Sequence, residues 1–345
     1  MALDNDIEAC FERGWSDGLP VVPPYGSRVE SMLAALGWSA TETLVELDDY
    51  GLEVRAILVA AIAVLAGCRD EYAPVLRPLT RLLLAPSFNI NGVAVTTGGC
   101  AVLVIVSGPI VQELGFASGA NTLGGSARIN LTVGRFANMV RHFCGRAGGI
   151  LEEFGVLGHP GRISFCVAEH EQTRWTRYHD QFGLDPEQSA ITITAAEGPN
   201  SVNNHYASSA EILLETIAGT IAHYGSTNFY WQTGGYTVVL APEHASLICE
   251  AFDRDDARRF VFEHSKRPGP ELVRLGRVPA DPDPRMSVDP EAPRSPLRSY
   301  EQLTFLESGG AAGKFSAVIP GWVGNITHAV ELRPDAEVFI MDRTR

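Results

Sequence analysis

The sequence lacks an excess of positive charge and lacks any long, uninterrupted apolar run. Among 345 residues, 27 Lys and Arg stand against 41 Asp and Glu, which gives a formal net charge of -14 at pH 7. Such a surface repels phosphate backbones and anionic headgroups. The longest nearly uncharged stretch, from Ile90 to Gln112, is interrupted by Gly, Asn and Pro and fits buried strands better than a membrane span. We therefore expect neither nucleic acid nor a membrane as a partner.

The sequence also lacks paired cysteine motifs and a secretory signal. No CxxC spacing connects the six cysteines, which predicts reduced and mostly buried thiols in an intracellular chain: Cys10, Cys68, Cys100, Cys144, Cys166 and Cys249. The first residues, MALDNDIEACFERGW, are acidic where a signal peptide would be basic. These features predict a cytoplasmic protein.

Apolar patterning indicates the fold class. Hydrophobic residues make up 45% of the chain and charged residues 20%, the balance of a globular protein with a buried core. Apolar runs rich in β-branched residues predict strands at Gly92 to Thr97, Ala101 to Ser107 and Tyr236 to Leu240. Helical spacing or an all-apolar run predicts helices such as Val54 to Ala66 and Ala127 to Phe143. The alternation predicts an α/β or mixed α+β fold, with a buried, largely parallel or mixed sheet covered by helices. No clean internal repeat is visible.

Proline and glycine divide the chain into four parts. Residues 1–30 form a Pro-rich N-terminal arm, 31–267 an α/β core, 268–299 a Pro-, Asp- and Arg-rich surface excursion or linker, and 300–345 a C-terminal segment that completes the core. Long irregular segments often wrap around a neighbouring subunit. We therefore expect a homo-oligomer.

The first candidate site is the sequence Cys166-Val-Ala-Glu169-His170-Glu171, at the end of a predicted strand. Open α/β sheets bind ligands at the carboxyl ends of strands. A thiol, an imidazole and carboxylates can supply a nucleophile and a general acid or base, or ligands for a metal. A strand end with a buried thiol and solvated charges explains the pattern equally well. Cys100 follows two glycines, whose amides could lower a thiol pKa.

Two further groups of polar residues follow later strands. Asn200, Asn204 and His205 lie in a turn-like cluster and could hold a substrate carboxylate, although an ordinary turn is the alternative for the asparagines. His244 lies in the first turn of a predicted helix, where the helix dipole keeps an imidazole neutral. A capping role is the alternative for His244.

Two glycine-rich loops complete the candidate residues. They are Leu123-Gly124-Gly125-Ser126, before a helix, and Gly309-Gly310-Ala-Ala-Gly313-Lys314. Glycine loops bind anions through backbone N–H groups, although simple tight turns explain them too. Neither loop has the spacing of a P-loop or of a dinucleotide fingerprint, and no flavin or PLP motif is visible. Gly124, Gly125, Gly310 and Lys314 are the predicted substrate-binding residues of these loops.

Several phrases of the chain together resemble a known group. GWSDGLPVVPP, AGCRDEYAPV, FNINGVAVTTGG, VIVSGPI, GHPGRISFCVAEHEQTRW and AVIPGW resemble large, mostly uncharacterised bacterial proteins found beside UGSC-motif (seleno)proteins. The resemblance extends from about residue 14 to about residue 325. It implies that a small UGSC-type partner supplies a reactive thiol or selenol, because this chain has no Gly-Ser-Cys motif. The stretch His170-Glu171-Gln172 departs from the group's Asn-Glu-Glu-like sequence.

These features predict an enzyme, or a large enzyme subunit, that acts on a small polar, carboxylated metabolite. In the leading hypothesis Cys166, Glu169, His170, His205 and His244 converge for nucleophilic and acid–base chemistry, in a lyase, a transferase or a thiol-dependent oxidoreductase. In one alternative, His170, His205, His244 and Glu169 bind a divalent metal. In another, the chain is a non-catalytic scaffold for the small partner.

Overall fold

The computed structural model describes residues 2–47, 52–125, 127–145, 154–284, 288–322, 327–332 and 339–341. Its helices are α1 (Ala2–Glu12), α2 (Gly26–Leu36), α3 (Ala56–Ala66), α4 (Ala73–Leu83), α5 (Ile90–Val95), α6 (Ile110–Glu113), α7 (Arg128–Cys144), α8 (Ala210–Ile221), α9 (Asn228–Trp231), α10 (Pro242–Cys249), α11 (Arg254–His264) and α12 (Gly269–Arg274). Its strands are β1 (Thr43–Leu47), β2 (Leu52–Arg55), β3 (Ala101–Ser107), β4 (Cys166–Ala168), β5 (Ala190–Ala196), β6 (Asn200–Asn203), β7 (Tyr236–Leu240), β8 (Leu303–Glu307), β9 (Phe315–Pro320), β10 (Thr327–Glu331) and β11 (Phe339–Met341).

The fold is mixed α+β, and its two main sheets are mixed rather than largely parallel. One sheet has the order β11-β10-β5-β3-β4 and the other β6-β9-β7-β8, while β1 and β2 form a separate hairpin. In the first sheet β3 and β4 are parallel and β5 is antiparallel to β3. In the second sheet β7 and β8 are parallel and β9 is antiparallel to β7.

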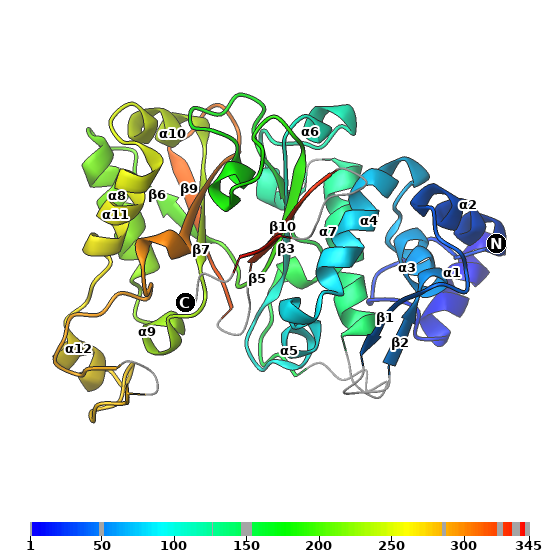
Figure 1. Cartoon of the computed structure of the whole chain (residues 1–345), viewed down its shortest axis with the longest axis horizontal. Coiled ribbons are helices and arrows are strands. Elements are labelled where there is room, and N and C mark those ends of the chain that lie inside the picture. Colours follow the sequence, from blue (N-terminus) through cyan, green and yellow to red (C-terminus); the bar gives the residue numbers. More distant parts are fainter. Residues whose placement is uncertain are drawn as a thin grey trace.

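The two sheets pack face to face, and helices cover their outer faces (Figure 1). Alternate residues of a strand point to opposite faces, and the apolar clusters follow that alternation. In β3, Leu103 and Ile105 pack between the sheets, whereas Val104 packs against the helices. In β7, Val239 packs between the sheets and Val238 packs toward α8, α10 and α11. The result is a four-layer helix–sheet–sheet–helix arrangement.

Four strands of each sheet share one topology, which makes the two halves a structural duplication, and β11 is an additional edge strand of the first sheet. In each sheet the first strand pairs in parallel with the second and in antiparallel with the third, and the fourth strand comes from the other half of the chain. Thus β6 follows β5 but pairs with β9, and β10 follows β9 but pairs with β5. A bridge between Ala196 and Gly321 marks where the two connections pass each other. The sequence alone gave no clear sign of this duplication, because the loops that join equivalent strands differ in length and composition.

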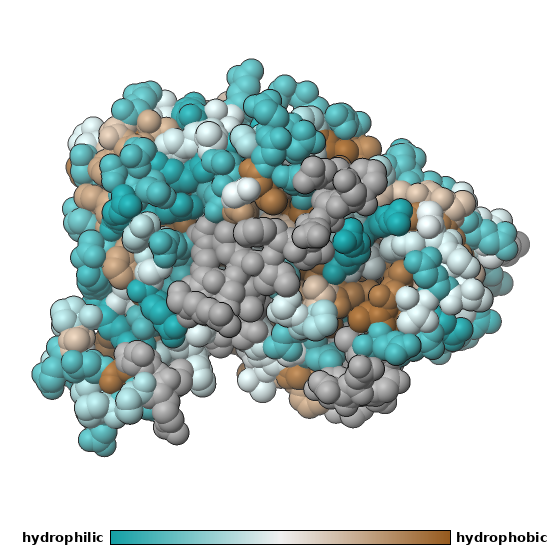
Figure 2. Space-filling view, viewed as in Figure 1, coloured by the Kyte–Doolittle hydropathy of each residue, from teal (hydrophilic) through white to brown (hydrophobic). Residues whose placement is uncertain are grey.

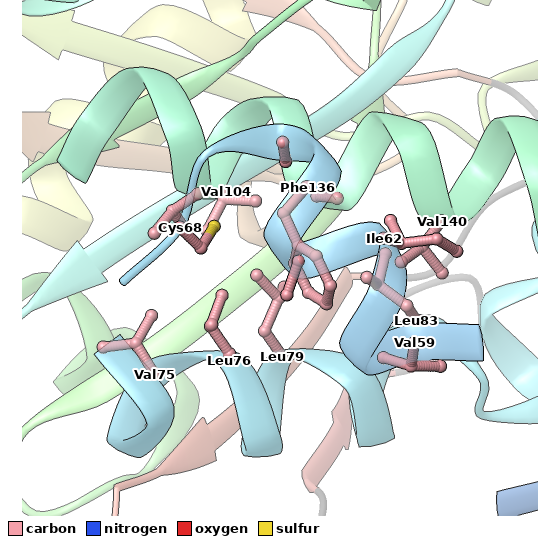
Figure 3. Close-up of a cluster of buried hydrophobic side chains, with 14 of the residues drawn as sticks. Val59, Ile62, Cys68, Val75, Leu76, Leu79, Leu83, Val104, Phe136 and Val140 are labelled. Carbon is pink, nitrogen blue, oxygen red and sulfur yellow. The ribbon is translucent and has the colours of Figure 1, made fainter. Parts of the chain in front are cut away.

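The first half carries an additional helical layer at the N-terminus. Helices α3, α4 and α7 interlock over β3, with Ile62, Leu79, Phe136 and Val104 among the contacting side chains (Figure 3). Arg135 of α7 forms an ion pair with Asp17 of the Pro-rich arm at 2.7 Å, and Val21 of the arm packs in the apolar core. The arm is therefore fixed to the core by both apolar and charged contacts.

The stretch from 268 to 299 contains more structure than its composition indicates. It includes α12, and Leu272, Val278 and Val288 pack with Phe229 of α9 in a small apolar cluster. The guanidinium of Arg294 donates to the carbonyl of Tyr230 at 2.9 Å. Side-chain burial therefore anchors this stretch to the second half.

One predicted strand is wrong. The residues predicted as a strand from Gly92 to Thr97 lie largely in α5, which begins after Asn89. Asn89 adopts a left-handed conformation, and its side chain accepts a hydrogen bond from Gly92 N at 3.1 Å. This cap and packing against α7 outweigh the β propensity of the valines. Within the described residues, no helix combines the length and the apolar character needed to cross a bilayer.

Candidate functional site

The two glycine-rich loops predicted from the sequence meet at one pocket of about 430 Å³. One wall is residues 120–124 from the first half of the chain, and the opposite wall is residues 308–313 after β8. The loops touch, since a Cβ added at Gly310 would lie 3.3 Å from Cα of Ala120. Ser201 of β6, Val239 of β7 and Ala317 of β9 line the rest of the cavity. The pocket therefore lies between the two halves of the duplication.

Ser308 holds the two loops together. Its Oγ donates to the carbonyl of Ala168 at 2.7 Å, and the Thr122 hydroxyl lies 2.7 Å from the same oxygen. Gly309 N donates to the carbonyl of Ser118 at 2.9 Å, with Gly309 at φ 126°, a backbone conformation that favours glycine. These contacts fix the shape of the pocket before any ligand enters.

Backbone amides and hydroxyls give the pocket its polarity. No side chain among its described lining residues is charged, and the amides of Gly310 and Ala312 have no hydrogen-bond acceptor within the described part of the chain. Lys314 lies between the lining residues Gly313 and Phe315, and its Nζ donates to the carbonyl of His205 at 3.1 Å. The amide of Gly313 donates to Glu243 Oε1 at 2.9 Å, so the free donors are those of Gly310 and Ala312, and they favour an anionic group in the ligand.

The loop after β4 corresponds to the loop after β8, but side chains fill the space beside it. There the loop after β4 carries Trp175, whose Nε1 donates to the carbonyl of Phe252 at 3.2 Å. Arg174 of the same loop forms an ion pair with Glu307, which is buried, and its amide donates to that carboxylate at 3.0 Å. Large side chains thus occupy the space that glycine and alanine leave open after β8. The two halves share a topology but not a pocket.

His205 and His244 do not line this pocket, but each contacts a residue that does. The His205 ring stands edge-on to Phe315 with 5.5 Å between ring centroids. His244 is a buried residue of α10, and its Nδ1 lies 2.8 Å from Oγ of Ser316. Ser316 lines the pocket, so His244 reaches the pocket through this contact. Burial lowers the pKa of His244, which keeps the ring neutral.

The residues of the first candidate sequence do not converge on the pocket. Cys166 faces the helical layer, and Glu169 faces the opposite way because β4 alternates. Glu169 is buried, its Oε1 accepts from Tyr178 N at 2.6 Å, and its Oε2 has no hydrogen-bond partner among the described residues. Burial raises the pKa of Glu169 to about 7. His170 donates its backbone N–H to the carbonyl of Glu307 at 2.8 Å, which joins the edges of the two sheets.

The thiols are poor nucleophiles in this fold. Burial raises the pKa of Cys100 to about 11 and raises the pKa of Cys166 still further. The expected lowering of the Cys100 pKa by glycine amides is therefore wrong, because its Sγ faces a dry core and lies 3.8 Å from the carbonyl of Val93. Cys68 lies among apolar side chains in the same way (Figure 3). Desolvation of the thiolate outweighs nearby positive charges.

We expect the native protein to react with less than one equivalent of 5,5′-dithiobis(2-nitrobenzoate) per chain at pH 8, because five of its six cysteines are buried and Cys249 is half-buried. In 8 M urea all six thiols should react. Absorbance of the released thionitrobenzoate measures both values. Fast native reaction that Cys166→Ala abolishes would restore Cys166 as a nucleophile.

The predicted metal site does not form. Within the described ranges, no three His, Cys, Asp or Glu side chains come close enough to hold a metal ion. Glu169 and His170 follow β4, whereas His205 and His244 belong to the second half, beside β6 and in α10. The ligand set His170, His205, His244 and Glu169 is therefore separated by the topology.

Other predicted binding residues have structural tasks. Asn204 uses its side chain to bind Thr216 Oγ1 and Tyr206 N, and Asn200 begins β6 beside Val318. Gly125 lies next to the pocket wall without lining it. The sequence reasoning missed Thr122, Ser201, Ser308 and Phe315. The Ser-Gly-Gly phrase directly after a strand was the available sign for Ser308, whereas only the fold brings Thr122 and Ser201 to it.

The fold and this site define a four-layer mixed α+β protein with a glycine-lined pocket between its two sheets. Comparison with protein-family models found no match, and comparison with curated proteins found none either. Hydrophilic residues dominate the face shown in Figure 2, with smaller hydrophobic areas toward the N-terminal helices.

Proposed function

We propose that this chain is an enzyme, or the large subunit of one, that binds a small polar, carboxylated metabolite in the pocket between the glycine-rich loops. The observation that carries the proposal is the meeting of two distant loops, residues 120–124 and 308–313, around one ligand-sized space. Preformed pockets with a few polar groups are typical of small-molecule sites. The amides of Gly310 and Ala312 and the ammonium of Lys314 are suited to a carboxylate.

Acid–base chemistry at this site falls to His205. His205 is exposed next to Phe315, whereas His244 and Glu169 are buried and His244 reaches the pocket only through Ser316. The hydroxyls of Ser201 and Thr122 can orient a polar substrate beside it. The chemistry proposed here uses an imidazole and hydroxyls in place of a cysteine. A lyase or a transferase step needs such a group to move a proton.

Lysine footprinting tests the proposal directly, because the chain contains two lysines, Lys314 and Lys266. We expect malonate, a small dicarboxylate, to slow acetylation of Lys314 by at least about threefold, since a bound carboxylate shields and engages its ammonium. Lys266, which pairs with Glu263 on α11, serves as the control within the same molecule. Mass spectrometry of peptides measures both rates.

A matched pair of variants completes this test. Lys314→Gln should weaken malonate binding about tenfold, as expected for loss of one charge-assisted contact, and Lys266→Gln should leave it unchanged. Equal protection of both lysines, or no protection by malonate, would contradict carboxylate binding in the pocket.

We also propose that the chain forms a homo-oligomer and that it binds a small UGSC-type partner. A subunit role is compatible with the pocket, because a partner could contribute the reactive group that the buried cysteines do not supply. Native mass spectrometry of the full chain, alone and after co-expression with a small UGSC-motif protein, tests both. A monomer that binds no small protein would leave the chain to act alone.

A further inference from the structure

One side of the pocket is aromatic, and binding of a carboxylate does not use it. Phe315 lines the pocket at the start of β9, and 45% of its side chain is exposed. The ring packs against Gly313, where an added Cβ would lie 3.5 Å from Cδ2 of Phe315. Glycine at that position leaves space beside the phenyl face. The pocket therefore offers a flat apolar surface next to its polar wall.

The aromatic side is held in place by its neighbours. His205 packs edge-on against Phe315 with an interplanar angle of 90°, and Lys314 holds the backbone of His205 through its carbonyl. The backbone of Phe315 pairs with Asn203 of β6. Three neighbouring segments thus restrict the motion of the ring. A restricted ring loses little conformational freedom when a ligand stacks on it.

We propose that the ligand of this pocket carries a planar aromatic ring as well as its anionic group. The ring stacks on Phe315, and the anionic group takes the unoccupied donors of the Gly310–Ala312 segment. A volume of about 430 Å³ accommodates both parts. This inference rests on the proposed function, because the anionic group of the ligand is the one that orients it in the same pocket.

Two ligands of equal charge and similar size measure how much an aromatic ring adds to the binding affinity. In calorimetric titrations of the full chain, we expect 3-phenylpropionate to bind about threefold to tenfold more tightly than 3-cyclohexylpropionate, the range expected of one aromatic pair. Phe315→Leu should remove this preference, since it keeps an apolar side chain and removes the ring. Phenyl phosphate, titrated in parallel, shows whether the loop amides prefer a phosphate or a carboxylate as the source of the anion.

Phe154 provides the matched control. Its side chain is also 45% exposed, and it does not line this pocket, so Phe154→Leu should keep the preference of the unchanged protein. Equal affinity for the two propionates, or equal effects of the two substitutions, would overturn the aromatic proposal. If malonate protects Lys314 in the footprinting test but the aromatic preference is missing, the inference fails and the proposed function stands. If no anion binds, both fail.

Discussion

Replacing Glu169 with glutamine is expected to make the stability of the protein less dependent on pH between about 4.5 and 8. Burial raises the pKa of this carboxyl from 4.5 to about 7 in the folded chain. Below pH 4.5 the carboxyl is protonated in both the folded and the unfolded states, so its contribution is fully present. As the pH rises, the unfolded chain releases the proton first, and stability is lost until the pH passes about 7. The shift corresponds to about 3 kcal/mol.

Urea unfolding at a series of pH values measures this contribution. The free energy of unfolding of the unchanged protein should fall relative to that of Glu169→Gln by up to about 3 kcal/mol across that range. Taking the difference between the two proteins cancels the pH-dependent contributions that they share. Glutamine keeps an oxygen that can accept from Tyr178 N, so the comparison changes little besides the titratable proton. Parallel curves for the two proteins would show that Glu169 is ionised in the fold.

Gly234→Ala is expected to destabilise the protein by about 2–3 kcal/mol. A Cβ at this position would lie 2.2 Å from the carbonyl oxygen of Gly321, which is backbone and has no rotamer to change. Gly321 N also donates to the carbonyl of Gly235, so movement there disturbs the crossing of the two halves. The loss of stability is expected because the added methyl group overpacks the place where the connections between the sheets pass each other.

Gly219→Ala is the matched control for that substitution. Gly219 lies in α8, and no heavy atom lies within 4 Å of an added Cβ. Because alanine has the higher helix propensity, this change should leave stability unchanged or raise it by up to about 1 kcal/mol. Thermal unfolding followed by circular dichroism compares the two variants. Similar melting temperatures would mean that the crossing tolerates a side chain.

Local elements were predictable where local interactions decide the conformation. The apolar run at β3, rich in valine and isoleucine, is a strand, and the periodic stretch at α7 is a helix. The residues of α5 were not predictable in this way. Their valines favour a strand, but the Asn89 cap and burial against α7 make them helical.

The sequence likewise predicted some features of the candidate site and not others. The glycine-rich loops were visible as loops, because glycine phrases after a strand or before a helix indicate turns that can approach a ligand. Which loops meet was not visible, since residues 120–124 and 308–313 are far apart in the chain. The orientation of His244 also depended on the fold. It lies at a strand's carboxyl end as predicted, but on the helix side of the sheet.

By itself, the sequence determined that this is an acidic α and β protein with a substantial apolar core, buried cysteines and two glycine-rich loops, because composition, periodicity and turn chemistry act over short distances. The tertiary structure decided that the chain forms two sheets that exchange strands and that one pocket stays open between the halves. It also decided that the thiols are desolvated and that Phe315 and His205 lie beside the glycine-rich wall of the pocket. Those outcomes depend on pairing and burial between distant segments, which no local pattern encodes.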